Sequence, residues 1–184
     1  MIAVEGFRQY VQGLYYDVPK GVYIGLFILF LFCLVLIMFS SGKNERTLTV
    51  NRLMLFEYLA LVLCSTVLLR SVNENRHYNF APLWSYESIQ NGHLELIAEN
   101  AMNVVAFFPI GFLLGCSFRR MCLWKVIMIG TCLSATVEGL QFYYKRGFSE
   151  VDDVIHNTIG CLLGYCAFCM LTWLVRKYRT QGNF

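Results

Sequence analysis

Five long apolar segments occupy most of this 184-residue chain and limit its fold more than any other feature. Residues 21–42 contain no charge at all and are long enough to cross a bilayer core of about 30 Å as a helix. The other four segments are 53–69, 94–118, 121–144 and 151–175. With 57% hydrophobic and 15% charged residues, the apolar content is too large for a soluble core of this size. The sequence therefore predicts an all-α, polytopic membrane helix bundle with about five transmembrane helices.

The residues before the first segment predict a short helix that lies in the membrane interface. Ala3, Phe7, Val11 and Leu14 recur at helical spacing with polar residues between them, although an unstructured tail is the alternative. The first segment lies far from the N-terminus and lacks the small-residue cleavage site of a signal peptide. We therefore expect residues 1–184 to form a single membrane domain that keeps its first span.

The distribution of Lys and Arg predicts the orientation of the five spans. Nine of the fifteen basic residues fall on the side that holds the C-terminus, and the other six fall on the side that holds the N-terminus. Since basic residues are enriched in cytoplasmic connections, the C-terminus is expected in the cytoplasm. The basic C-terminal residues Arg176, Lys177 and Arg179 suit anionic lipids, and we expect no nucleic-acid partner.

Acidic and amide residues gather at one predicted membrane face of the last three segments. Glu99 and Asn103 are four residues apart, as are Asp153 and Asn157, so each pair shares one helix face. Ionisable groups in membrane spans are costly and normally face a bundle interior or a water-filled cavity. The cluster is therefore a candidate site at the outer face. Its further members are Glu138, Gln141, Arg146 and Asp152.

Two glycine pairs predict close packing between the third and fifth segments. Gly111 and Gly115 are four residues apart, as are Gly160 and Gly164, and such pairs let helix backbones approach closely. Pro109 in the third segment should bend that helix and make room for a polar pocket on its outer side.

The eight cysteines fall mostly inside the apolar segments, where they suit small buried side chains. Cys166 and Cys169 form a C-x-x-C, but no second pair and no His stands at zinc spacing. The sequence therefore predicts neither a metal site nor another cofactor.

Four ordered motifs resemble the VanZ-like family. They are the stretch RHYNFAPL from Arg76 to Leu83, the stretch NVVAFFPIGFLLG from Asn103 to Gly115, Ser134 with Glu138 and Gln141, and Arg146 followed by VDDVIHNTIG from Val151 to Gly160. The resemblance covers about residues 76–165. Glu150 stands where the family has the first Asp of Asp-x-Asp-Asp, and Leu83 replaces the Phe that follows the loop proline.

The resemblance implies a multi-pass protein of the bacterial cytoplasmic membrane. The founding member of the family is associated with low-level resistance to the glycopeptide teicoplanin. The motifs carry Arg76 and Asn79 in the loop, which we expect to fold over the outer pocket as ligand-binding residues beside Glu99, Asn103, Gln141, Arg146 and Asn157.

Three interpretations of the cluster remain open at this stage. In the first, the pocket binds a membrane lipid, a lipid-linked envelope precursor or a lipoglycopeptide, because Arg holds phosphate well. In the second, the chain is an enzyme acting on a lipid-linked substrate, with Glu138, Asp152 or Asp153 as general acid or base. In the third, the charged groups form an interhelical ion-pair network that only holds the bundle together. The sequence does not set the oligomeric state.

Overall fold

The computed structural model describes residues 43–181, and this part of the chain is a bundle of membrane-length helices. Four helical stretches are long and apolar enough to cross a membrane, which confirms the all-α membrane bundle. They are α3 (Lys43–Leu63) continued by the π-helical turn η1 (Cys64–Leu68), α5 (Glu95–Ser117), α6 (Leu123–Tyr144) and α7 (Val151–Gln181).

Two predicted elements, the interfacial helix and the span 21–42, lie outside the described residues. The remaining boundaries agree closely with the prediction, since α5 and α6 each begin and end within two residues of the apolar segments. Two helices are longer than predicted: α3 begins at Lys43 and not at residue 53, and α7 ends at Gln181 and not at residue 175. The first turns of α3 carry the polar and charged residues Lys43, Asn44, Glu45 and Arg46. These residues end an apolar segment in the sequence, but they are compatible with a helix.

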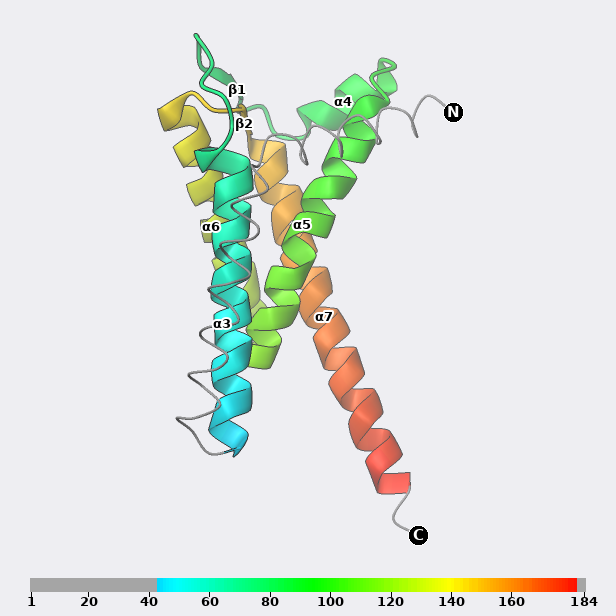
Figure 1. Ribbon diagram of the computed structural model, residues 1–184. Coiled ribbons are helices and arrows are strands. Elements are labelled where there is room, and N and C mark those ends of the chain that lie inside the picture. The colour runs from blue at the N-terminus through cyan, green and yellow to red at the C-terminus, as the bar shows by residue number, and fades with distance from the viewer. Residues whose placement is uncertain (1–42, 182–184) are drawn as a thin grey trace.

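Helices α5 and α7 cross near the middle of the bundle with their backbones in close approach (Figure 1). A Cβ atom at Gly111 of α5 would overlap the carbonyl oxygen of Cys161 in α7. A Cβ atom at Gly164 of α7 would overlap the carbonyl oxygen of Phe108 in α5. The predicted tight packing of these two spans is confirmed, and it depends on glycine at both positions. Helix α5 also continues without a break through Pro109.

The apolar core lies where α3, α5, α6 and α7 meet. Tyr58 of α3 adds a polar link, because its hydroxyl donates a 2.9 Å hydrogen bond to the carbonyl oxygen of Ala106 in α5. This link lies just below the polar end of the bundle described next. The buried core residues are Leu55, Val62, Phe107, Ile110, Leu114, Val126 and Cys161.

Three short elements lie together at one end of the bundle, at the top of Figure 1: β1 (His77–Asn79), β2 (Phe148–Glu150) and α4 (Trp84–Gln90). Strands β1 and β2 pair in parallel, with His77 opposite Phe148 and Asn79 opposite Glu150. This pairing holds the loop that follows η1 against the start of α7. Three-residue strands are too short to show an alternating pattern, so the sequence does not reveal them.

Candidate functional site

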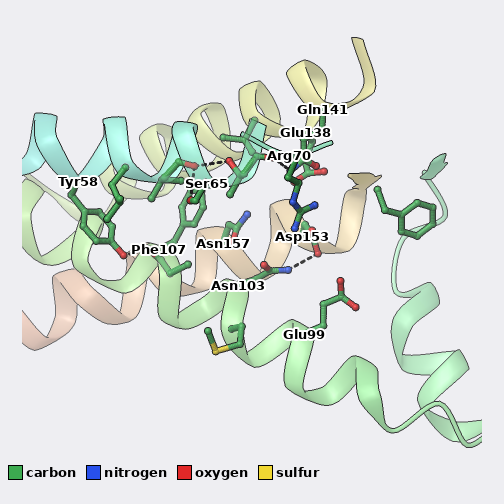
Figure 2. Close-up of a pocket in the computed structure, with 17 residues that line it drawn as sticks. Tyr58, Ser65, Arg70, Glu99, Asn103, Phe107, Glu138, Gln141, Asp153 and Asn157 are labelled. Atoms are coloured by element: carbon green, nitrogen blue, oxygen red, sulfur yellow. Dashed lines mark hydrogen bonds between the residues drawn. The ribbon is translucent and has the colours of Figure 1, made fainter. Parts of the chain in front are cut away.

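A pocket of about 350 Å³ opens between α3, η1, α5, α6 and α7 at the end of the bundle that carries the two strands (Figure 2). Its polar lining comes mainly from the helix turns nearest that end, and most of its apolar lining comes from the next turns inward, whereas Met102, Val137 and Phe148 lie beside the polar groups. The polar residues are Ser65, Thr66, Arg70, Glu99, Asn103, Glu138, Gln141, Asp153 and Asn157. The apolar and aromatic residues are Tyr58, Leu61, Val62, Met102, Ala106, Phe107, Val137 and Phe148.

Six of the predicted site residues meet in this pocket although they come from three helices. Asn103 of α5 donates a 2.6 Å hydrogen bond from Nδ2 to Oδ1 of Asp153 in α7, which joins two of the predicted stripes (Figure 2). Glu138 is 7% exposed and lines the pocket from α6. The spacing of these residues on their helices therefore predicted their common orientation. The six are Glu99, Asn103, Glu138, Gln141, Asp153 and Asn157.

The cation of the pocket is Arg70, which is one of the six basic residues on the N-terminal side but was not among the predicted site residues. Its charge acts on all three pocket carboxylates, Glu99, Glu138 and Asp153. Within residues 43–181, however, its guanidinium makes no hydrogen bond and no ion pair within 4.0 Å. The guanidinium rests against Gly147, whose φ of +77° and lack of a side chain leave space for it. The sequence feature that could have identified Arg70 is its position, because it is the first charged residue after the apolar segment 53–69.

Two amide side chains in the pocket have unpartnered oxygens. Gln141 is 5% exposed and donates through Nε2 to the carbonyl oxygen of Thr66 at 3.1 Å, which leaves its Oε1 without a partner. Asn157 is 4% exposed and donates through Nδ2 to Oγ of Ser134 at 2.8 Å, which leaves its Oδ1 without a partner. Buried acceptors of this kind need an explanation, because most are satisfied in native structures.

Asp152 does not line the pocket, contrary to the expectation that it belongs to the cluster. It is fully buried, and its carboxylate accepts hydrogen bonds from the backbone N–H groups of Leu83 and Ser85 and from the Ser85 hydroxyl. One residue along a helix turns a side chain by about 100°, so Asp152 and Asp153 face different neighbours. Asp152 holds the first turn of α4 onto α7.

Arg146 also lies elsewhere. Its Nη1 donates to the carbonyl oxygens of Val67 and Leu68, at the last turn of η1. Such carbonyls lack partners within their own helix, so the guanidinium completes the helix end. Arg146 therefore joins the turn after α6 to the end of η1 and does not enter the pocket.

The two loop residues expected to cover the pocket are likewise absent from its lining. The Arg76 guanidinium lies over the Phe142 ring, 5.2 Å from its centroid. The Asn79 side chain accepts a 3.0 Å hydrogen bond at Oδ1 from the N–H of Ala81, which shapes the loop. Arg76 therefore joins the loop to α6, and Asn79 stabilises a turn within the loop.

Glu150 connects the pocket wall to α4. Its backbone N–H donates to Oε2 of Glu138 at 3.0 Å, and its own Oε2 accepts a 2.9 Å hydrogen bond from the Trp84 indole. Burial raises the pKa of Glu150 to about 8, and the charges of Asp153 and Glu99 act in the same direction. Near neutral pH this side chain is therefore largely protonated, and it links α4 to the strand that precedes α7.

The donor set does not favour a metal ion. Across residues 43–181 no group of three or more His, Cys, Asp or Glu side chains is arranged to hold one. The pocket instead combines separated carboxylates, amide oxygens and one guanidinium, an arrangement suited to an organic ligand with its own charges.

The sequence profile of the VanZ/LLP1 family matches residues 24–174, a longer stretch than the motifs alone cover. Protein VanZ of Enterococcus faecium is 37% identical over 62 residues, which make up 34% of this chain and 38% of that protein. The chain thus matches well under half the length of this curated relative. No solved structure matches significantly.

Proposed function

Because the chain belongs to the VanZ/LLP1 family of membrane proteins, we propose that it acts in the bacterial cell envelope by binding a lipid or lipid-linked precursor in the pocket. By occupying or shielding such a molecule, it contributes to resistance against glycopeptides of the teicoplanin type. The family supports the membrane location and the link to resistance, and the pocket supports the binding.

The observation that carries the proposal is the division of the pocket lining. Charged and amide groups line its end near the membrane surface, and Tyr58, Leu61 and Phe107 line the turns further inward. A lipid has the same division, with a polar head group at the surface and apolar chains below it. The apolar turns continue from the polar end into the bundle, so an acyl chain there would be surrounded by apolar side chains as it is in the bilayer.

With the C-terminus in the cytoplasm, as the basic residues predict, the pocket belongs to the outer leaflet of the cytoplasmic membrane in this proposal. The opposite end of the described helices carries a second hollow lined by Arg52, Arg119, Arg120 and Lys125, in keeping with a cytoplasmic face. The pocket with Glu99 and Asp153 then opens on the side where envelope precursors are exposed to glycopeptides. The C-terminus lies in the cytoplasm in this arrangement.

The two alternative interpretations lose part of their support. Neither Arg70 nor Arg146 forms an ion pair within 4.0 Å with the pocket carboxylates Glu99, Glu138 and Asp153, so an interhelical ion-pair network lacks its contacts at this end of the bundle. For an enzyme, one of the three proposed acid or base residues, Asp152, is committed to α4, and the other two, Glu138 and Asp153, line the pocket. Binding requires no group beyond those present.

The experiment compares Glu99→Gln with Glu95→Gln, one helix turn earlier on α5. Glu99 lines the pocket, whereas the Glu95 side chain is 65% exposed and lies outside it. Both variants are scored for membrane abundance, for lipid co-purified with the protein and for protection of cells against teicoplanin. We expect Glu99→Gln to reduce both bound lipid and protection at unchanged abundance, and Glu95→Gln to match the wild type. Equal lipid content and equal protection in both variants would contradict the proposal.

A further inference from the structure

Most of the pocket-lining side chains that carry hydrogen-bond donors already donate to a partner within the protein. The side-chain donors of Tyr58, Ser65 and Thr66 are used on backbone carbonyl oxygens. The three pocket amides Asn103, Gln141 and Asn157 each use one N–H, on Asp153, on the Thr66 carbonyl and on Ser134 respectively. Among the lining side chains, each amide keeps a second N–H, and the Arg70 guanidinium is the cation whose donors have no partner.

The groups left without partners are acceptors. Gln141 Oε1 and Asn157 Oδ1 lack any partner, although both residues are at least nine-tenths buried. Three carboxyl groups share the same space with one guanidinium. A buried acceptor without a donor costs free energy, and so does a buried charge without a counter-charge. A ligand that brings N–H donors and positive charge would satisfy both.

The free guanidinium sets a second requirement. Arg70 is not engaged by any carboxylate within 4.0 Å, so its planar donors remain available to an anionic group. Arg binds phosphate through two parallel hydrogen bonds, which gives both strength and orientation. The pocket therefore offers one anion site beside several sites for a cationic donor.

We propose that the ligand is an amphiphile whose head group carries a primary ammonium next to a phosphate, as in phosphoethanolamine lipids. The phosphate binds Arg70, and the ammonium donates to Glu138, Asp153 and the free amide oxygens. The acyl chain lies along the apolar turns of α3 and α5. This inference rests on the proposed function and names the chemical class of its ligand.

Other head groups meet these requirements less well. Phosphatidylglycerol supplies the phosphate but no positive charge for the carboxylates. Phosphatidylcholine supplies the charge, but its trimethylammonium has no N–H to donate to Gln141 Oε1 or Asn157 Oδ1. A bare metal cation finds no cluster of ligands in the described part of the chain.

The test measures lipid retention by the purified full-length protein with native mass spectrometry. The head group is varied through phosphatidylethanolamine, its N-methyl and N,N-dimethyl derivatives, phosphatidylcholine and phosphatidylglycerol, all with the same acyl chains. We expect retention to fall with each methyl group and to differ at least about tenfold between the ends of the ammonium series, because each step removes a charge-assisted donor. Phosphoethanolamine without acyl chains should bind more weakly than the lipid.

Variants assign the effect to the pocket. Asp153→Asn and Glu138→Gln should abolish the preference for phosphatidylethanolamine over phosphatidylglycerol, and Glu95→Gln should keep it. If either buried variant fails to accumulate, Glu99→Gln serves in its place, since Glu99 is only partly buried.

Each contrary outcome has its own meaning. Equal or stronger retention of phosphatidylglycerol would overturn the ammonium assignment but leave lipid binding intact. Equal binding of phosphoethanolamine and the full lipid would overturn the lipid assignment. A folded protein that retains none of the lipids would overturn the proposed function itself.

Discussion

The carboxylate of Asp152 accepts two hydrogen bonds from Ser85, one from its backbone N–H at 2.9 Å and one from its hydroxyl at 2.5 Å. The next residue, Asp153, faces the pocket instead and accepts from Asn103. Two adjacent acidic residues thus have separate roles. Asp152 fastens α4 to the bundle, and Asp153 provides a charge for a ligand.

Asp152→Asn should therefore lower stability more than Asp153→Asn. An asparagine retains one oxygen for three donors, and its NH₂ group meets N–H donors where an acceptor is required. We expect a loss of about 3 kcal/mol in the free energy of unfolding for Asp152→Asn, measured by SDS titration of the purified protein. A smaller loss for Asp152→Asn than for Asp153→Asn would contradict the division of roles.

Replacement by Lys should affect ligand binding at Arg70 and protein stability at Arg146. Arg70→Lys keeps the charge but loses the paired donors, so phosphate-lipid retention should fall about tenfold while membrane abundance stays normal. Arg146→Lys loses the contacts with Val67 and Leu68 and should lower abundance or the melting temperature. Quantitative immunoblotting and lipid retention on the same preparations separate the two. The assignment fails if Arg146→Lys loses lipid and Arg70→Lys does not.

Gly164→Ala should separate α5 from α7. The added Cβ would overlap the Phe108 carbonyl oxygen, which belongs to the backbone and cannot rotate away. We expect a loss of about 2 kcal/mol in unfolding free energy.

Gly139→Ala is the matched control for that substitution. A Cβ atom at Gly139 of α6 meets nothing within 4 Å, so alanine should be neutral or stabilise the helix by up to about 1 kcal/mol. Equal effects of the two alanines would show that the close approach of α5 and α7 is not needed.

The stability of the protein should fall as pH rises through the pKa of Glu150. The folded state raises this pKa from 4.5 to about 8, so protonation favours folding. The contribution is fully present below about pH 4.5 and is lost as pH passes about 8. Glu150→Gln keeps an acceptor for Trp84 but does not ionise, so its melting temperature should change less between pH 5 and pH 9. At pH 5 the folded protein keeps Glu150 protonated, and pH 9 is roughly one unit above the raised pKa. Glu95→Gln, with an exposed side chain, should follow the wild type.

The sequence by itself determined the span positions and much of the pocket lining. Span positions follow from apolar length, because the bilayer core sets the number of helical residues required. The stripes with Glu99 and Asn103, and with Asp153 and Asn157, were predictable because residues four apart lie on one helix face. The packing of α5 on α7 was predictable from glycines, since only their spacing was needed.

Only the tertiary structure decided which charged residues enter the pocket. Asp152 and Asp153 are adjacent residues of the same type, so the sequence does not distinguish their roles. The rotation of α7 about its axis turns Asp152 toward α4 and Asp153 toward the pocket. Arg70 enters the pocket and Arg146 does not, because the loop after η1 and the turn after α6 pair with one another. These contacts join residues more than 70 positions apart, and no local pattern in the chain specifies them.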